Sequence, residues 1–321
     1  MNNQYNIDKG LHVVIGATGS YGYAITKMLL KNKINTRAIV RNEEKALRLF
    51  PKNLDIIKSD IFNREDIAKN LAGASVIYIA NNFPYKSWEN YYKSTENILS
   101  GAGISHSIIV FPGNVYGYGK FDYLPVDEKH PLNARSKKGI LRNNLESKLL
   151  EYYRRDKIGL TIPRFADFYG PNVTNDLYGG MFINAIKNKK TIWPVNANLP
   201  HNLTYIDDAA KATLLLLENL DSCGETYHIA GDIITPAEFI NKIYNRLNLS
   251  AKLKVISERN LKFLAHFNSN INELIELLYE YKYPYIIDDT KFLSKYKSFK
   301  HTPYDEGIEK TIEWFKNIYK Q

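Results

Sequence analysis

The segment Leu11-His-Val-Val-Ile-Gly-Ala-Thr-Gly-Ser-Tyr-Gly22 decides the fold of this chain. It joins a short apolar run to a GxxGxxG turn, and a helix pattern follows the turn as far as Lys31. In such a turn the first glycine bends tightly, the second lets the backbone approach a diphosphate, and the third lets the helix pack closely. Because the amino end of a helix attracts anions, the segment predicts a dinucleotide site rather than a purely structural turn. The residues assigned to that site are Gly16, Thr18, Gly19, Ser20, Tyr21 and Gly22.

Apolar runs alternate with helix patterns through the first half of the chain. Runs at 11–15, 36–40, 54–58, 76–80, 107–111 and 160–164 predict strands, and segments 21–31, 43–50, 64–71, 88–99 and 136–155 predict helices. Continuous apolar strands separated by helices are typical of a buried parallel sheet. We therefore expect a Rossmann-like, doubly wound α/β domain over residues 1–170, with additional sheet segments near 200–232. A smaller substrate-binding lobe is expected mainly over 171–321.

The composition is that of an ordinary globular protein, with 44% apolar and 24% charged residues among 321. The net charge of +9 suits phosphate-bearing ligands, but the lysines are scattered, so no nucleic-acid partner is expected. The one cysteine, Cys223, excludes an intramolecular disulfide. No run reaches the length of a membrane span, and residues 1–10 lack the apolar core of a leader peptide. A cytoplasmic location without membrane association is therefore expected.

The end of the second predicted strand bears on the choice between NAD and NADP. It reads Val40-Arg41-Asn42, and the first acidic residue is Glu43. Enzymes that prefer NAD usually carry an acid at this point, which accepts the ribose hydroxyls. A guanidinium suits a 2′-phosphate instead, so Arg41 predicts a preference for NADP(H), with NAD(H) as the alternative. Arg37 or Lys45 would assist if they faced the same side, and a solvated surface position is the other interpretation of Arg41.

Motifs in a fixed order make the chain resemble the extended short-chain dehydrogenase/reductase superfamily, in its epimerase/dehydratase branch. They are the glycine turn, Asp60-Ile61, Ile77-Tyr-Ile-Ala80, Asn114-Val-Tyr-Gly117, Arg164-Phe-Ala-Asp-Phe-Tyr-Gly-Pro171 and His201-Asn-Leu-Thr-Tyr-Ile-Asp-Asp208. The resemblance implies that Asp60 and Ile61 cap the adenine and that Ala80 and Phe165 lie along the cofactor. It also implies a small-molecule substrate, a sugar or similar compound, between the dinucleotide domain and the lobe. Asp60 could equally be a turn residue that caps a helix.

The positions that carry catalysis in that superfamily are substituted in this chain. Counting back from Val115-Tyr116-Gly117, the usual serine or threonine falls at Pro112. The usual tyrosine falls at Lys138 and the usual lysine at Arg142, and Glu146 supports this registration. Without the phenol, the proton relay of the superfamily is absent.

Three explanations of these substitutions remain open. In the first, Lys138 contacts the cofactor and is the acid/base, with Arg142 as its electrostatic neighbour and Asn114 as donor to the substrate oxygen. Lys138-x-x-x-Arg142-x-x-x-Glu146 is similar to the KxxxRxxxE helix of isoflavone-reductase-like NADPH reductases, and burial or a nearby cation would have to promote proton release from the lysine. In the second, tyrosines of the turn at Tyr116 transfer the proton. In the third, the protein binds its cofactor without catalysis, as NmrA-like regulatory members do.

The first explanation predicts an NADPH-dependent oxidoreductase acting on a small carbonyl or sugar-like substrate. The alternatives are an NAD-dependent nucleotide-sugar epimerase or dehydratase and a non-catalytic, NADP-responsive regulatory protein. A solvated basic helix start is the structural interpretation of Lys138. A homodimer through segments 88–99 and 136–155 is a further expectation.

Other conspicuous residues have structural interpretations. Asp207 and Asp208 precede an Ala-rich run and predict the first turn of a helix. Arg164 either orients its loop or meets an anionic substrate. Segment 261–285 has helical spacing and predicts lobe core or a subunit contact. The histidines lack the spacing of metal ligands, so no metal site is expected at His130, His201 and His228.

Overall fold

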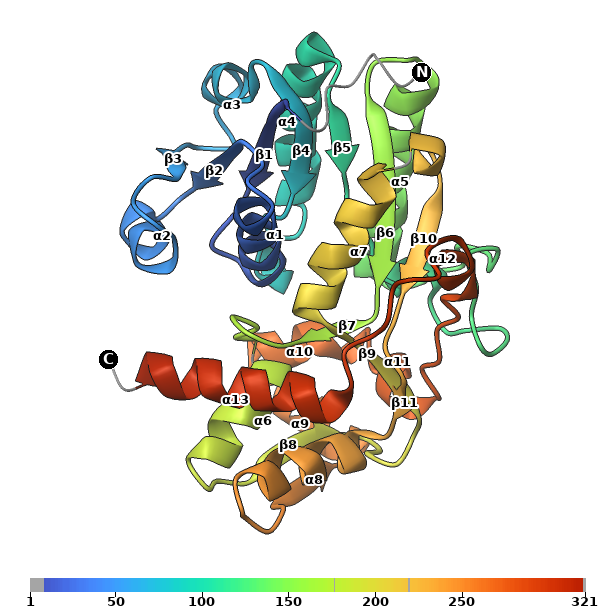
Figure 1. The fold of residues 1–321 in the computed structure, drawn as a ribbon. Coiled ribbons are helices and arrows are strands. Elements are labelled where there is room, and N and C mark those ends of the chain that lie inside the picture. Colours follow the sequence, from blue (N-terminus) through green and yellow to red (C-terminus); the bar gives the residue numbers. More distant parts are fainter. Residues whose placement is uncertain (1–8, 176, 219, 320–321) are drawn as a thin grey trace. The chain divides into compact units, whose positions relative to one another are not determined.

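The computed structural model describes residues 9–175, 177–218 and 220–319 (Figure 1). Residues 1–8, on which most of the expectation about a leader peptide rests, lie outside the described residues. The chain divides into two compact units. The first comprises Met1–Gly113, Leu141–Arg164 and Ala209–Tyr227, and the second comprises Asn114–Ile140, Phe165–Asp208 and His228–Gln321. This division differs from the expected boundary at residue 170, because 114–140 belongs to the second unit, whereas the return of 209–227 to the first unit agrees with the segments expected near 200–232.

A large sheet forms the centre of the first unit, with seven strands within the described residues in the order β10-β6-β5-β4-β1-β2-β3 (Figure 1). The pairs β1/β2, β2/β3, β1/β4, β4/β5 and β5/β6 are parallel. The strands are β1 (Leu11–Ile15), β2 (Thr36–Val40), β3 (Asp55–Lys58), β4 (Ala74–Ile79), β5 (Ile108–Val110), β6 (Gly159–Phe165) and β10 (Thr226–Ile229). The Rossmann-like, doubly wound prediction is confirmed. Strand order reverses between β1 and β4, which is the place where such sheets bind ligands.

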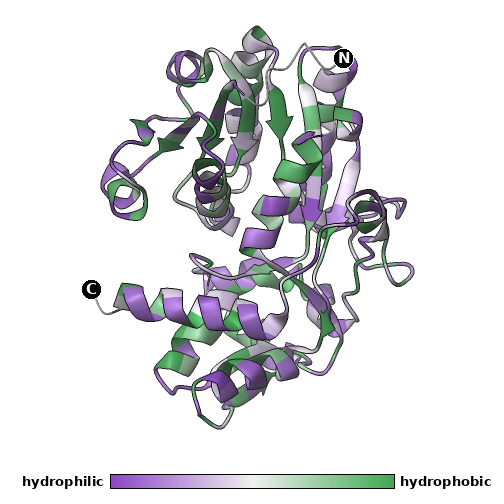
Figure 2. Ribbon diagram, viewed as in Figure 1, coloured by the Kyte–Doolittle hydropathy of each residue, from purple (hydrophilic) through white to green (hydrophobic). Residues whose placement is uncertain are grey.

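Helices connect these strands, as predicted. They are α1 (Ser20–Lys31), α2 (Glu43–Leu49), α3 (Arg64–Leu71), α4 (Asn90–Ser105), α5 (Lys137–Arg154) and α7 (Ile206–Glu218), with short turns η1 (Tyr85–Ser87), η2 (Tyr116–Tyr118) and η3 (Leu220–Ser222). Asn42 and Asn63 begin α2 and α3 with side-chain caps. Strands β1, β4 and β5 are strongly hydrophobic (Figure 2), because helices on both faces of a parallel sheet bury them.

Helix α4 differs most from its predicted range of 88–99. It begins at Asn90 and continues to Ser105, through Gly101 and Gly103. Gly101 does not end the helix. A Cβ at this position would lie 3.0 Å from the Cα of Ala68 on α3. The glycine therefore serves the close packing of α4 on α3.

The second unit contains two small sheets and a group of helices. Strands β7 (Asp167–Tyr169), β9 (His201–Tyr205) and β11 (Ile233–Ile234) form one sheet, and β8 (Thr191–Pro194) and β12 (Leu253–Ile256) form the other. The helices are α6 (Tyr178–Ile186), α8 (Pro236–Arg246), α9 (Glu258–Ala265), α10 (Ser269–Ile275), α11 (Tyr279–Lys282), α12 (Thr290–Lys295) and α13 (Tyr304–Tyr319). The rings of Phe182, Phe239 and Phe315 join α6, α8 and α13 in a buried aromatic core.

Segment 261–285 forms parts of three short helices. Leu277, Leu278 and Tyr281 are buried, as expected of lobe core, whereas Phe263 and Phe267 are 64% and 78% exposed. The apolar pattern therefore marks core mainly in its second half, with Leu261 as the buried residue of the first half. No helix in the described part of the chain is long and apolar enough to cross a membrane. Cys223 is half-buried, with its Sγ 4.0 Å from Oγ1 of Thr161.

Candidate functional site

The glycine turn lies at the carboxyl end of β1, beside the point where strand order reverses. Gly16 has a φ of +81°, and a Cβ on it would lie 2.6 Å from the Cα of Asn81. A Cβ on Gly22 would lie 2.3 Å from the carbonyl oxygen of Gly16. Both positions therefore exclude any larger residue. The first turn of α1 contains no acidic side chain that would repel an anion at this helix end.

Asn81 follows β4 at the same edge of the sheet, and sequence reasoning missed it. Its Oδ1 and Nδ2 are both buried and make no hydrogen bond within the described part of the chain. Buried amides are rarely left without partners, so this one indicates a polar ligand. Its position directly after a predicted strand, at the carboxyl edge that carries the glycine turn, is the signal that could have found it. The tight turn and the unpaired amide together fit a dinucleotide.

The residues expected at the adenosine end lie on the neighbouring strands β2 and β3. The backbone N–H of Ser59 donates to the carbonyl oxygen of Val40 at 3.2 Å, so Arg41 and Asp60 leave adjacent strand ends. Arg41 is exposed. Asp60 accepts the N–H of Phe62 at 2.9 Å, which is a turn contact.

Two residues near this end have other roles. Asn63, not Asp60, caps α3. Arg37 lies at the opposite end of β2, where its Nε donates to Asp55 at 2.8 Å, so it does not assist Arg41.

Other predicted cofactor residues are buried. Ile61 and Ala80 are 6% and 9% exposed. The hydroxyl of Tyr21 lies 2.8 Å from Oγ1 of Thr213, so this side chain fastens α1 to α7. Burial raises the pKa of that phenol. Phe165 is buried in the second unit, where its ring packs against Phe168 at 5.2 Å.

Arg142 has a fixed position in the first unit. Its Nη2 donates to the carbonyl oxygen of Pro112 at 2.5 Å. Its guanidinium lies 4.3 Å from the ring centroid of Phe111 and 5.9 Å from that of Tyr91. Burial raises the pKa of Tyr91, and the arginine charge partly opposes this shift. Pro112, at the usual serine or threonine position, thus contributes its backbone oxygen.

Lys138 is buried in the second unit, with 3% exposure. Its Nζ donates to Oε2 of Glu273 at 2.6 Å, to Oε1 of Glu276 at 2.5 Å and to the backbone oxygen of Glu273 at 3.1 Å. The prediction of a solvated basic helix start is wrong for Lys138 itself, although Lys137 is exposed. Lys138 is thus buried, as the first explanation allows, but its charged neighbours are carboxylates and not the expected cation.

The turn at Tyr116 lies in the second unit as well. Asn114 accepts the N–H of Tyr116 at 3.2 Å, and Tyr116 is 9% exposed. The hydroxyl of Tyr118 lies 2.7 Å from Nε2 of His228, whose Nδ1 lies 3.0 Å from the carbonyl oxygen of Asp288. Because that carbonyl can only accept, Nδ1 carries the proton and Nε2 accepts from Tyr118. This phenol is therefore committed to a structural bond.

Three further groups have structural partners. Arg164 donates through Nη2 to both oxygens of Glu146, at 2.6 Å each, in a buried ion pair within the first unit. Asp207 and Asp208 stand in the first turn of α7, as predicted. Asp208 also accepts two hydrogen bonds from Thr302.

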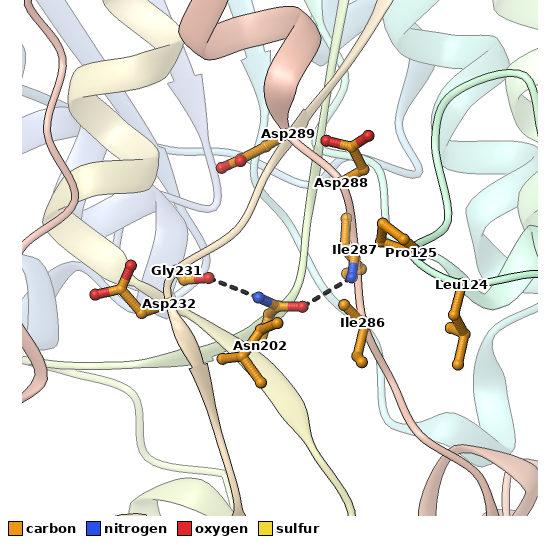
Figure 3. Close-up of a pocket in the computed structure, with 10 residues that line it drawn as sticks. Leu124, Pro125, Asn202, Gly231, Asp232, Ile286, Ile287, Asp288 and Asp289 are labelled. Atoms are coloured by element: carbon orange, nitrogen blue, oxygen red, sulfur yellow. Dashed lines mark hydrogen bonds between the residues drawn. The ribbon is translucent and has the colours of Figure 1, made fainter.

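A pocket of about 540 Å³ opens in the second unit (Figure 3). Asn202 bridges the oxygen of Gly231 and the N–H of Ile287, as the dashed lines in Figure 3 show. The pocket wall includes Asp232, Asp288 and Asp289 beside apolar side chains. None of the predicted site residues lines it.

A dinucleotide-binding Rossmann fold with its glycine turn at the switch point defines the class of protein. The model of the NAD dependent epimerase/dehydratase family matches residues 12–230, and the chain belongs to this family.

Curated relatives come from archaea and bacteria. A protein of Methanocaldococcus jannaschii named for UDP-glucose 4-epimerase activity is 30% identical over 200 residues, which cover 58% of this chain and 61% of that protein. The UDP-N-acetyl-alpha-D-glucosaminuronate decarboxylase of Bacillus cytotoxicus is 23% identical, over 81% of this chain and 79% of the relative. The 4-hydroxy-2-methyl-3-oxo-4-farnesyl-3,4-dihydroquinoline-1-oxide ketoreductase of Stigmatella aurantiaca is 23% identical, over 80% and 79%.

Solved structures share the fold. The dTDP-glucose 4,6-dehydratase of Bacillus anthracis, in complex with NAD, superimposes with a TM-score of 0.80 at 17% identity, over 96% of this chain and 97% of that one. The UDP-glucuronic acid 4-epimerase of Bacillus cereus, in complex with NAD, gives 0.79 at 18% identity, over 96% and 99%.

Proposed function

We propose that this protein is an NADP(H)-dependent oxidoreductase that reduces the carbonyl group of a small organic or sugar-like substrate. Lys138 is its proton donor in place of the usual tyrosine. The observation that carries the proposal is the buried ammonium of Lys138, held by two carboxylates.

The cofactor assignment is supported by the glycine turn, the unpaired amide of Asn81 and the exposed Arg41 at the end of β2. Gly16, Gly19 and Gly22 would admit the diphosphate, Asn81 would bond a polar group of the cofactor, and Arg41 would pair with the 2′-phosphate. Bound in its reduced form, the dinucleotide supplies a hydride to the carbonyl carbon.

The direction of reaction follows from the charge of Lys138. Reduction of a carbonyl needs a proton at the oxygen as the carbon is reduced, and an ammonium can give one. Removing a hydride from a hydroxyl-bearing carbon, as in an epimerase, needs a base at the hydroxyl oxygen, a role that an ammonium group does not serve. A relative named as a ketoreductase supports the same direction. The geometry thus favours reduction over the epimerase alternative.

Replacement of Lys138 tests the proposal. The full chain is assayed with NADPH or NADH against a panel of ketones, aldehydes and UDP-sugars. We expect NADPH oxidation with at least one carbonyl compound, and a loss of kcat by about 10² to 10⁴ in Lys138→Ala and Lys138→Met. The Kd for NADPH, measured by calorimetry, stays within about twofold because Lys138 does not hold the dinucleotide tightly.

The other outcomes assign the protein differently. Parallel loss of NADPH affinity and turnover in both variants contradicts the role of Lys138 as proton donor. Interconversion of UDP-sugars with tightly retained NAD identifies an epimerase. Dinucleotide binding with no turnover across the panel identifies a non-catalytic protein.

In Arg41→Ala, we expect the affinity for NADPH to fall about tenfold or more while that for NADH is unchanged, since a charged hydrogen bond contributes about 1.5–3 kcal/mol.

A further inference from the structure

We propose that Glu273 and Glu276 have separate functions toward Lys138: Glu276 positions its ammonium, and Glu273 returns a proton to it from solvent after each turnover. This inference rests on the proposed function. Both glutamates lie at the end of α10, far along the sequence from Lys138, and belong to the same unit as the lysine.

The burial of Lys138 creates the need for a relay. Its side chain is 3% exposed, whereas those of Glu273 and Glu276 are 30% and 23% exposed. Nζ donates hydrogen bonds to both of these partly exposed residues, so their carboxylates offer it a route to solvent. A lysine that has lost its proton inside such a site regains one through a hydrogen-bonded group that is in contact with solvent.

The two carboxylates are bonded differently. Glu276 uses both oxygens, because Oε1 accepts from Nζ of Lys138 and Oε2 accepts from the backbone N–H of Lys137 at 2.6 Å. It thereby fixes the lysine to the amino end of α5, where a carboxylate is favoured by the helix dipole. Glu273 uses Oε2 for Lys138, and its Oε1 makes no hydrogen bond within the described part of the chain. Glu273 is therefore the one with an oxygen open to water.

Lys138 gives up one proton and regains one in each catalytic cycle. As the carbonyl carbon gains a hydride, the ammonium of Lys138 would protonate the oxygen to give the alcohol. Lys138 is left as a neutral amine. A proton from solvent would enter at Oε1 of Glu273, and rotation of the carboxyl group would turn that O–H toward Nζ. Its transfer to the amine would restore the ammonium and the carboxylate.

The first test measures the reactivity of Lys138 without cofactor or substrate. The full chain is treated with acetic anhydride at pH 8, and acetylation of Lys138 and of the exposed Lys137 is quantified by mass spectrometry. Only a neutral amine reacts. We expect acetylation of Lys138 relative to Lys137 to rise about tenfold in the double variant Glu273→Gln/Glu276→Gln, because Nζ is no longer held in ion pairs with two carboxylates. Unchanged acetylation would overturn the proposal.

The second test separates relay from positioning by chemical rescue. We expect Glu273→Ala to lower kcat about tenfold or more with an unchanged KM, and added formate or acetate to restore much of it. Glu276→Ala should also lower kcat, but small carboxylic acids should not restore it, because they do not rebuild the anchor at Lys137. Glu273→Asp should retain more activity than Glu273→Ala, and Glu273→Gln provides a conservative variant if the alanine variant does not fold.

Glu258 provides the matched control. It lies on α9 of the same unit and pairs with Lys262 at 2.8 Å and Lys282 at 2.7 Å, away from Lys138. Glu258→Ala should keep wild-type kcat and show no response to acetate. Wild-type kcat in Glu273→Ala, or a loss that acetate leaves unchanged, overturns the relay while Lys138→Ala remains inactive. Wild-type activity in Lys138→Ala instead overturns the proposed function.

Discussion

Gly22 is the residue at which the dinucleotide site tolerates least change. A methyl group there would lie 2.3 Å from the oxygen of Gly16, a distance that forces the turn or the start of α1 to move. We expect Gly22→Ala to weaken NADPH binding about tenfold or more, measured by calorimetry, with a smaller loss of melting temperature.

Gly103 supplies the control for this substitution. It also lies in a helix, but nothing lies within 4 Å of a Cβ placed on it. Gly103→Ala should leave the Kd for NADPH unchanged and stabilise the protein by about 0.5–1 kcal/mol, since alanine favours helix more than glycine does. Equal affinities in the two variants would show that the turn does not hold the dinucleotide.

At the scale of elements, α5 and β6 are joined by the buried ion pair of Glu146 and Arg164. Both oxygens of the carboxylate bond one guanidinium nitrogen, and the two side chains are 11% and 4% exposed. Removing the carboxylate takes away the close counter-charge of a buried guanidinium. We expect Glu146→Ala to lower the free energy of unfolding by about 3–5 kcal/mol, measured by urea denaturation.

An exposed pair where the same helix ends tests whether burial is the cause. Glu151 and Arg155 lie four residues apart and pair at 2.6 Å, with more than half of each side chain exposed. Glu151→Ala should change stability by less than about 0.5 kcal/mol. Similar losses in the two variants would rule out burial as the source of the effect.

At the scale of the whole molecule, buried carboxyl groups determine how stability depends on pH. Burial raises the pKa of Asp167 from its ordinary value to about 6, although Tyr178 donates a hydrogen bond to it at 2.9 Å. Burial also raises the pKa of Glu280, and Asp167 adds to that shift. The stability contribution of such groups is complete below their unfolded pKa and is lost as pH rises through the folded one.

We therefore expect the melting temperature to fall between pH 5 and pH 7.5. The rise of about two units in the pKa of Asp167 changes the free energy of unfolding by at most about 3 kcal/mol. Asp167→Asn should flatten this dependence and be more stable than the wild type at pH 8, as measured by calorimetry. Asp232→Asn, at an exposed position in the same unit, should follow the wild-type curve. A wild-type curve that is level over this range contradicts the burial argument.

Features that depend on residues close together in the sequence could be predicted. Strands such as β4 and β5 are almost entirely apolar, and the glycine turn has its spacing within seven residues, so both are visible locally. The partners of Lys138 could not be predicted, because Glu273 and Glu276 are 135 and 138 residues away along the chain. Polar residues on a short helix give no indication of which distant cation they will meet.

The division of the chain was beyond local reasoning for the same reason. Segment 114–140 follows β5 directly, but Val126 bonds to Ile286 and Asp288 and so places the segment in the second unit. Likewise, segment 261–285 has one continuous helical pattern, but it forms separate short helices because Asn268 caps a new one. Long-range backbone pairing explains the first case, and a local helix cap explains the second.

Cys223 has a practical consequence for work on this protein. Burial raises the pKa of its thiol, so little thiolate is present at neutral pH and maleimides will react with it slowly. The sequence contains no other cysteine. Cysteines introduced at exposed positions will therefore take up fluorophores or spin labels ahead of the native one, and the unmodified background already suits spectroscopic distance measurements.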